Sequence, residues 1–180
     1  LNISESTARR DITALDKAGR LVKVFGGAIA LEDSVLSSEP TVAQKTEVQI
    51  EEKKRIAKYA ASLIEPKDFV YLDAGTTTGY MIEYLEERSA TFVTNAVAHA
   101  QRLAAEGVRV FMIGGELKSS TEAIIGSEAV MALKNYHFTK GFFGTNGVHP
   151  QRGLTTPDSE EALVKKKAME RCAQCFVLAD

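Results

Sequence analysis

Apolar and polar positions follow two different rhythms along the 180 residues of this chain. Near the N-terminus, Ala8, Ile12 and Leu15 recur at helical spacing, which predicts a helix. Apolar runs at residues 21–25 and 28–31 flank a glycine turn. We therefore expect a β-hairpin after that helix.

The chain changes character after the hairpin. Residues 32–46 are polar, rich in Ser and Thr, and contain a proline, which predicts a linker. A helical pattern then runs from about Val48 to Pro66. We therefore divide the chain into an N-terminal unit of residues 1–31, this linker, and a C-terminal unit of residues 47–180.

In the C-terminal unit, short apolar runs alternate with helical patterns. We expect strands at residues 69–72, 91–93, 108–113, 141–143 and 176–178, and helices at residues 76–87, 96–106, 127–135 and 160–173. Continuously apolar runs are typical of strands that are buried on both faces. About five alternations of strand and helix predict an α/β fold, with a mostly parallel sheet flanked by helices.

Composition and charge narrow the class of protein. The chain is 44% apolar and 26% charged, which is ordinary for a folded globular protein. No apolar run approaches the roughly 18 residues of a membrane span, and no signal-peptide pattern is visible, so we expect a cytoplasmic protein without a membrane partner. The net charge is −2, but residues 1–30 hold five basic and three acidic residues. That local excess favours an anionic partner for the N-terminal unit.

Cysteine and histidine positions do not indicate metal chemistry. Cys172 and Cys175 are three positions apart, and no second Cys pair or His pair completes a four-ligand zinc site. Both fall late in a predicted helix, so we expect them to be packing residues rather than a redox pair. His99, His137 and His149 lie far apart in the sequence. We expect no metal and no cofactor.

The segments that follow the predicted strands are small, polar or rich in glycine. Ligands of open α/β sheets bind outside the carboxyl ends of the strands, so these segments are the candidate site. They are residues 73–79, 94–95, 114–116 and 144–147. Four polar segments at one edge favour a phosphate-bearing ligand over turns with a purely structural role.

The loop of residues 73–79 is the most informative of these segments. A helix that begins there offers unpaired N–H groups and the positive end of its dipole, and three threonine hydroxyls add donors. Gly75 and Gly79 allow the backbone to approach an anion closely. The alternative is an ordinary threonine cap after a β-turn.

Two kinds of charged residue are candidates at this edge. Asp73 stands at a strand tip, where it either accepts hydrogen bonds from sugar hydroxyls or caps the next helix. Lys165, Lys166 and Lys167 form a run on the last helix. Such runs are usually solvated, but one of the three can reach the anion, since only one face of the helix turns inward. The alternative for Lys165 is an ion pair with Glu161, four residues earlier.

Several familiar catalytic and nucleotide-binding motifs do not occur in the sequence. There is no G-x-G-x-x-G after a strand, no G-x-x-x-x-G-K-[ST] and no G-x-S-x-G. A dinucleotide site, nucleoside triphosphate hydrolysis and acyl transfer are therefore not supported. A small phosphorylated metabolite fits the polar segments better than a nucleotide.

Taken together and in order, these motifs resemble the DeoR-type family of bacterial transcriptional regulators of sugar metabolism. The recognition helix and wing of such a winged helix-turn-helix are similar to Ser4, Thr7, Arg9, Arg10 and Asp11 together with residues 19–28. The family's effector-sensing domain is similar to residues 72–78, 93–95, 113–115, 125–126, 144–147 and 164–165.

The resemblance implies a sensor domain similar in fold to ribose-5-phosphate isomerase, which binds a phosphorylated sugar effector and alters operator affinity. By the same resemblance, the effector pocket is lined by Asp73, Gly75, Thr76, Thr77, Thr78, Asn95, Gly115, Gly144, Asn146, Gly147 and Lys165. DNA contacts are implied for Thr7, Arg9, Arg10 and Lys23. The expected partners are operator DNA, a phosphorylated sugar and further copies of the chain, because such repressors read repeated half-sites through symmetry.

The chain departs from the family pattern in three respects. The first helices of the helix-turn-helix are missing, so we expect residues 1–31 to be a partial DNA-binding domain. Lys23 and Phe25 stand where the family often has arginine and histidine. The family continues beyond the position of Asp180, so we expect the sensor domain to be incomplete at its C-terminal end.

Three functions remain open at this point. A repressor of sugar metabolism accounts for both the basic N-terminal unit and the polar edge, and it implies no enzyme activity. A sugar-phosphate isomerase-like enzyme, with Asp73 or Glu161 as general base, is the alternative. A structural or oligomerisation module would leave the polar segments as mere turns. The identity of the sugar, the operator sequence, the direction of the effect on DNA binding, and the choice between dimer and tetramer cannot be read from the sequence.

Overall fold

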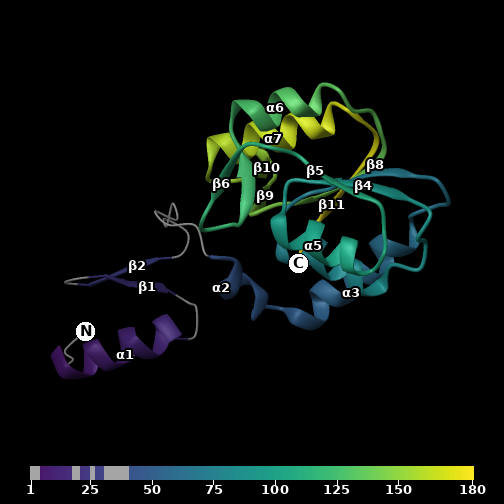
Figure 1. Cartoon of the computed structure of the whole chain (residues 1–180). Helices are drawn as coiled ribbons and strands as arrows, with labels where there is room; N and C mark the ends of the chain where they lie inside the picture. The colour runs from purple at the N-terminus through teal and green to yellow at the C-terminus, as the bar shows by residue number, and fades with distance from the viewer. Residues whose placement is uncertain (1–4, 18–20, 25–26, 31–40) are drawn as a thin grey trace. The chain divides into compact units, whose positions relative to one another are not determined.

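The chain divides into two compact units, residues 1–39 and 40–180. The computed structural model describes residues 5–17, 21–24, 27–30 and 41–180. In the first unit, helix α1 (Glu5–Lys17) is followed by strands β1 (Leu21–Val24) and β2 (Gly27–Ala30) (Figure 1). The strands pair antiparallel, with Leu21 opposite Ala30. The predicted helix and hairpin are thus present, while Ser4, Gly19 and Phe25 lie outside the described residues.

Two helices open the second unit. Helix α2 (Val42–Thr46) begins with a capping box, in which the Thr41 hydroxyl accepts from the Gln44 N–H at 3.3 Å and the Gln44 side chain accepts from the Thr41 N–H at 2.9 Å. This helix lies in the segment predicted as a linker, because the reciprocal cap stabilises a short helix despite its polar composition. Helix α3 (Ile50–Ser62) follows.

A five-stranded parallel sheet forms the centre of the second unit. Its strand order is β11 (Cys172–Leu178), β8 (Phe138–Gly144), β3 (Phe69–Leu72), β4 (Thr91–Thr94) and β5 (Val110–Met112). The chain proceeds from β3 through β4 to β5 and then returns to the other side of β3 through β8. The topological switch point therefore lies between β3 and β8. The prediction of a mostly parallel sheet is confirmed.

The central strands are buried on both faces, and their side chains alternate between two apolar clusters. Val70, Leu72, Phe92 and Phe142 pack in the cluster that contains residues of α3 and of α5 (Val97–Ala105). The residues that follow Val70, Phe92 and Phe142 point to the opposite face. There they meet α6 (Ser127–Leu133) and α7 (Ser159–Met169). Figure 1 shows the two helix pairs on opposite sides of the sheet.

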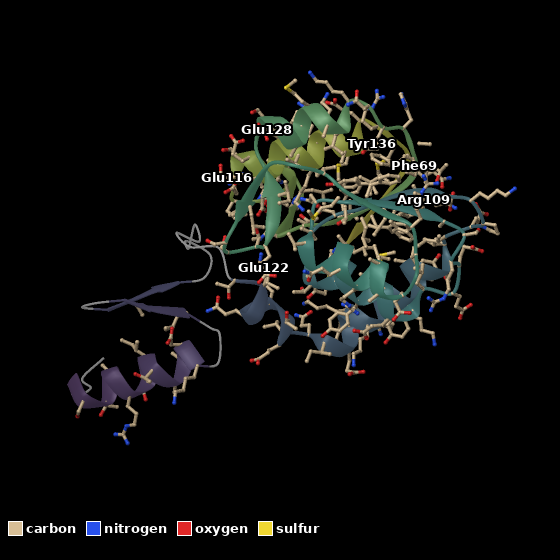
Figure 2. All side chains as sticks on the ribbon, in the orientation of Figure 1. Phe69, Arg109, Glu116, Glu122, Glu128 and Tyr136 are labelled. Atoms are coloured by element: carbon tan, nitrogen blue, oxygen red, sulfur yellow. The ribbon has the colours of Figure 1, made fainter. Side chains whose placement is uncertain are left out.

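Aromatic rings close the amino end of the sheet. Phe69 of β3 and Tyr136, before β8, have ring centroids 5.9 Å apart, and Phe138 lies 5.3 Å from Phe69 (Figure 2). These rings have a packing role, whereas the polar loops predicted as the site lie at the opposite, carboxyl edge.

Two antiparallel hairpins stand outside the predicted elements. They are β6 (Glu116–Lys118) with β7 (Ala123–Ile125), and β9 (Gly147–His149) with β10 (Gly153–Thr155). Strands of three residues are too short to give a periodic signal. The predicted helix over residues 76–87 is a short α4 (Thr76–Tyr80) continued by a 3-10 turn (Met81–Tyr84).

The last predicted helix ends earlier than expected. Helix α7 ends at Met169, and Cys172 and Cys175 lie on β11, not late in a helix. Seven residues of β11 run beside β8, with Cys172 opposite Phe138. This strand pairing overrides the weak helical pattern of the local sequence.

Within the described ranges, no helix combines the length and the apolar character that a membrane crossing requires.

Candidate functional site

The candidate site lies at the topological switch point, where β3 and β8 end side by side. Asp73 follows β3, and the Gly144 N–H at the end of β8 donates to Asp73 Oδ2 at 3.1 Å. Lys165 of α7 forms an ion pair with the same carboxylate, and its Nζ also donates to the Gly144 carbonyl at 3.3 Å. Three residues that the sequence assigns to one pocket therefore contact one another directly.

Asp73 is fully buried. Burial raises the pKa of its carboxyl group above the ordinary value, and the Lys165 ammonium and the Gly144 N–H only partly offset this effect. Among the described residues, Asp73 Oδ1 has no hydrogen-bond partner. A buried carboxylate oxygen without a donor costs free energy, so this atom is a ready acceptor for a ligand hydroxyl.

The loop after Asp73 is shaped by Gly75 and Thr78. Gly75 has φ of 156°, a conformation that side-chain-bearing residues rarely adopt. The Thr78 hydroxyl lies 2.8 Å from the Asp73 carbonyl and 2.9 Å from the Gly75 carbonyl, and its single hydrogen is shared between these two acceptors, which closes the turn. Thr78 therefore has a structural role.

The start of α4 leaves donors available. The N–H groups of Thr76, Thr77 and Thr78 lie in the first turn, where a helix supplies no acceptor. No partner for the Thr76 hydroxyl is present in the part of the chain that the structure describes. These groups can donate to a bound anion.

Asn95 fastens the loop to its neighbours. Its Oδ1 accepts from the Ala74 N–H at 2.9 Å, and its Nδ2 donates to the Ile124 carbonyl at 3.4 Å. The side chain is buried and both of its polar ends are engaged. Asn95 thus links the loop to strand β7.

His99 is a residue at this loop that the sequence analysis did not select. Its Nε2 lies 3.2 Å from the Gly75 carbonyl, which can only accept, so this nitrogen carries the hydrogen. Burial lowers the pKa of His99 to about 4, so the ring is neutral at pH 7. A Cβ on Gly79 would lie 2.8 Å from Nε2, which explains the glycine there. His99 and Leu103 are four residues apart on the buried face of α5, and this helical spacing could have identified His99 as a buried residue.

A second polar cluster surrounds the start of α7. The Thr121 hydroxyl donates to Glu161, and Lys118 pairs with Glu161 at 3.2 Å and with the capping Asp158 at 2.9 Å. Glu161 therefore pairs with Lys118 of β6, and Lys165 pairs with Asp73. The alternative of an ion pair between Glu161 and Lys165 is wrong, because both side chains find partners across the fold.

Three other predicted residues shape the hairpins. A Cβ on Gly115, whose φ is 148°, would lie 2.5 Å from the Ile125 carbonyl. The Asn146 N–H donates to the Thr155 carbonyl at 3.1 Å, and the Gly147 carbonyl accepts from the Thr145 hydroxyl at 2.9 Å. These contacts belong to the hairpins β6–β7 and β9–β10.

A cavity of about 310 Å³ adjoins Lys165. It lies between the β9–β10 hairpin and α7, and its lining residues are Gly144, Thr145, Leu154, Thr155, Thr156, Ala162, Lys165, Lys166, Met169 and Glu170. The buried Thr156 hydroxyl has no partner among the described residues. The cavity shares Gly144 and Lys165 with the Asp73 cluster and adds room for the body of a small ligand.

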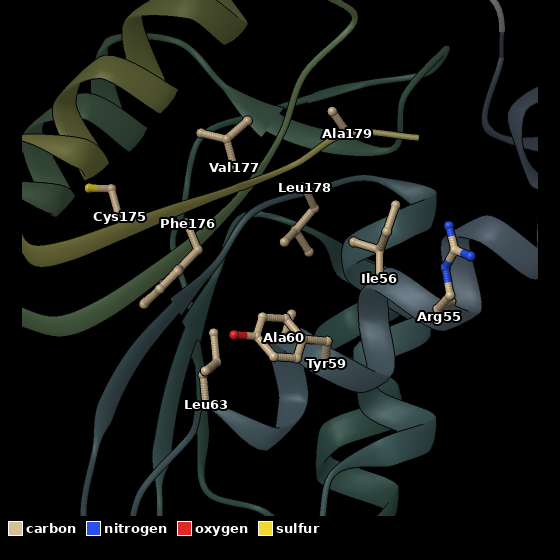
Figure 3. A pocket seen from close by; sticks show the side chains of 10 residues that line it. All are labelled: Arg55, Ile56, Tyr59, Ala60, Leu63, Cys175, Phe176, Val177, Leu178 and Ala179. Atoms are coloured by element: carbon tan, nitrogen blue, oxygen red, sulfur yellow. The ribbon is translucent and has the colours of Figure 1, made fainter.

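A second cavity, of about 550 Å³, lies between α3 and the outer edge of β11. Figure 3 shows the side chains around it, which are mostly apolar: Arg55, Ile56, Tyr59, Ala60, Leu63, Cys175, Phe176, Val177, Leu178 and Ala179. None of the residues predicted to bind a ligand lines this cavity.

Comparison with known families assigns both units. Residues 48–180 match the DeoR C-terminal sensor domain, and residues 1–34 match the DeoR-like helix-turn-helix domain. The chain belongs to the DeoR family of transcriptional regulators. The resemblance read from the sequence motifs is confirmed.

Individual relatives of this DeoR-family chain are regulators as well. It is 44% identical over 180 residues to the "Uncharacterized HTH-type transcriptional regulator FruR" of Bacillus subtilis, covering 99% of this chain and 71% of that protein. It is 33% identical to the B. subtilis "HTH-type transcriptional repressor GlcR" (100% and 69% covered). It is 34% identical to the "Lactose phosphotransferase system repressor" of Streptococcus mutans (100% and 72% covered).

Solved structures support the predicted fold of the sensor domain. Ribose-5-phosphate isomerase A from Neisseria gonorrhoeae has a TM-score of 0.55 at 15% identity, covering 74% of this chain and 52% of that one. A ribose-5-phosphate isomerase in complex with phospho-erythronic acid has a TM-score of 0.54 at 19% identity, covering 73% and 52%. At such low identity the likeness shows the fold alone.

The predicted DNA contacts of this DeoR-family chain lie in its first unit. Thr7, Arg9 and Arg10 are on α1, and Lys23 is on β1. Arg10 is exposed and Thr7 is half-buried, whereas the side chains of Arg9 and Lys23 lie outside the described residues.

Proposed function

We propose that this regulator is a repressor whose sensor domain binds a phosphorylated sugar at the switch point between β3 and β8. The observation that carries the proposal is the Asp73 cluster. A buried carboxylate keeps one oxygen free, contacts the ammonium of Lys165, and lies beside the unpaired N–H groups that open α4. Anion donors and a hydroxyl acceptor within one small site match the two ends of a sugar phosphate.

Each group then has a distinct role in binding. The phosphate accepts from the first-turn N–H groups and the Thr76 hydroxyl, while Lys165 supplies positive charge. A sugar hydroxyl donates to Asp73 Oδ1. The cavity beside Lys165 holds the rest of the molecule. The relatives include a lactose phosphotransferase system repressor, which supports a sugar-derived effector for this chain.

The first unit serves operator binding. On α1, Thr7 and Arg10 are three residues apart and so share one face, which suits contact with bases or phosphates in the major groove. Operator half-sites are read by symmetric oligomers, so the working form is an oligomer in the cytoplasm, where operator DNA and phosphorylated sugars occur. The effector changes operator affinity only by its differential affinity for two states of the protein.

An isomerase-like activity is the alternative, and the described geometry does not favour it. Lys118 and Thr121 hold Glu161, and the ammonium of Lys165 pairs with Asp73, which makes both carboxylates weaker bases although Asp73 Oδ1 accepts no hydrogen bond from the described residues. The solved isomerases share the fold, and a fold hosts many functions. We therefore propose no enzyme activity. Turnover of an aldose or ketose phosphate that is lost in Asp73→Asn would reverse this conclusion.

Isothermal titration calorimetry on the whole chain tests the proposed function. Phosphorylated sugars are titrated in parallel with the same sugars without phosphate. We expect at least one phosphorylated sugar to bind and its unphosphorylated form not to bind. The Asp73→Asn variant should weaken that binding, whereas Glu106→Gln, which removes an equal charge from an exposed ion pair with Arg88, should not. If no phosphorylated sugar binds, the sensing role is rejected.

A further inference from the structure

The β6–β7 hairpin is tied to the loop that follows β3. On strand β7, the Ile124 N–H donates to the Asn95 carbonyl at 2.7 Å, and Ala123 pairs antiparallel with Ala96. Asn95 also accepts from the Ala74 N–H of the loop, at 2.9 Å. A change in the position of this loop is therefore passed to β7 through Asn95.

Helix α7 holds the same hairpin from another side. Lys118 of β6 pairs with Glu161 at 3.2 Å, and the Thr121 hydroxyl, in the turn of the hairpin, donates to the same carboxylate. Glu161 is buried and lies about one helical turn before Lys165, whose ammonium pairs with Asp73. One face of α7 thus connects the candidate effector site to strand β6.

The turn of the hairpin contacts α2. The Ser120 carbonyl accepts from the Val42 N–H at 3.1 Å. Val42 is the first residue of α2, and the first N–H groups of a helix have no acceptor inside it, so this bond joins α2 to the hairpin at no cost to the helix. Helix α2 is the first described element after the boundary between the two units, at residues 39 and 40 (Figure 1).

We propose that the β6–β7 hairpin and α2 form one cooperative unit, which transmits occupation of the effector site to the segment that joins the sensor domain to the helix-turn-helix unit. The proposal rests on the proposed function, because the effector must contact the loop after β3 and Lys165. Coupling between two sites needs an element on which both act. The hairpin is such an element, since Asn95 and Glu161 hold it on the effector side and Val42 holds it on the α2 side.

The substitution Val42→Pro breaks the proposed connection at one bond. Proline has no N–H, so the bond to Ser120 is lost, whereas α2 is preserved because proline is favoured at the first position of a helix. The residue before a proline must be extended, and Thr41 already has φ of −66° and ψ of 161°. Val42→Ala is the matched control, because it also changes the side chain but keeps the N–H.

The first test needs no ligand and measures amide hydrogen exchange of the whole chain by NMR. If the hairpin and α2 open together, the loss of one hydrogen bond makes their opening easier. We expect the Ile124 N–H to exchange about three- to tenfold faster in Val42→Pro than in Val42→Ala. The Phe92 N–H, which donates to the Arg109 carbonyl at 2.9 Å in the central sheet, should exchange equally in the two variants.

Three results of this test overturn the proposal. The first is equal exchange of the Ile124 N–H in Val42→Pro and Val42→Ala. The second is an equal acceleration at Ile124 and Phe92, because the bond from Val42 would then support the whole fold rather than one unit with the hairpin. The third is a Val42→Pro chain that does not fold, which has the same meaning as the second.

The second test adds a phosphorylated sugar that binds in calorimetry and follows two amide NMR signals, Ile124 in β7 and Lys45 in α2. We expect both signals to shift in the wild type and in Val42→Ala. In Val42→Pro, the Ile124 signal should still shift, and the Lys45 signal should not. A Lys45 signal that does not shift in the wild type, or that still shifts in Val42→Pro, overturns the transmission to α2. If no phosphorylated sugar binds, the proposed function fails, while the exchange test still decides whether the hairpin and α2 form one unit.

Discussion

Lys165 of α7 forms an ion pair with Asp73, which lies 92 positions earlier and directly after the central strand β3. This pair, together with the Gly144 N–H, fixes the carboxylate at the point where the sheet reverses its winding direction. Helix α7, strand β8 and the loop before α4 are therefore joined at one buried position. We expect a ligand that binds there to act on all three elements.

The Asp73–Lys165 pair makes the first prediction. Lys165→Met should destabilise the chain by about 3–5 kcal/mol, because it leaves the buried Asp73 carboxylate without its cation. Urea unfolding at pH 7 measures the free energy. The double variant Lys165→Met/Asp73→Asn should recover a large part of the loss. Losses that simply add in the double variant would show that the two residues do not interact.

The buried His99 ring predicts a pH dependence of stability. Its pKa is lowered from 6.5 to about 4 in the folded chain, so between these values the unfolded chain binds more protons. The contribution of His99 is therefore complete above pH 6.5 and is lost as the pH falls toward 4, by about 3 kcal/mol at most. Unfolding free energies of the wild type and His99→Gln should converge over this range. Parallel pH curves for the two proteins would exclude this role of His99.

The conformation of Gly75 predicts that an added methyl group affects binding and stability together. At φ of 156°, Gly75→Ala is strained, and its Cβ would lie 3.3 Å from the Thr78 hydroxyl. We expect a loss of about 1–2 kcal/mol in stability and a marked loss of effector affinity. Gly107→Ala is the matched control, since φ is 74° there and no atom lies within 4 Å. It should lose stability but keep effector affinity. If Gly75→Ala and Gly107→Ala lost effector affinity equally, the Gly75 loop would have no specific role in effector binding.

Thr76 and Thr78 should affect different properties: Thr76 effector affinity, and Thr78 the stability of the fold. The Thr76 hydroxyl has no partner in the described part of the chain, so Thr76→Val should leave stability within about 0.5 kcal/mol and weaken effector binding about tenfold. The buried Thr78 hydroxyl donates its hydrogen to the Asp73 and Gly75 carbonyls, so Thr78→Val should cost about 1–3 kcal/mol in stability. Calorimetry and urea unfolding of both variants check this. Unchanged affinity in Thr76→Val would remove its hydroxyl from the site.

The sequence predicts the parallel sheet and the polar carboxyl edge because both depend on local patterns. Apolar runs identify buried strands, and the residues directly after them lie at one edge whatever the strand order. Asp73 and Gly144 lie at the same edge for this reason, and they meet because β3 and β8 are neighbours. The order in which strands pair is not local, so the switch point itself could not be read from the sequence.

The pattern of apolar and polar positions does not reveal ion-pair partners that are distant in the sequence. Lys53 recurs at helical spacing with Ala57, Ala60 and Ile64. A lysine on such an apolar face could have been predicted to be buried and to need an anionic partner. Its anion, Asp180, is 127 positions away. Likewise, the i,i+4 rule places Glu161 with Lys165, whereas the fold offers each a partner on another element. Tertiary contacts decide which of several local options is realised.

Titration of the isotopically labelled whole chain with a phosphorylated sugar, followed by amide NMR shifts, tests the central claim most directly. The proposed site predicts that the largest shifts fall on residues 75–78 and on Gly144, with smaller changes elsewhere. Shifts confined to the apolar cavity between α3 and β11, around Tyr59 and Leu63, would contradict it.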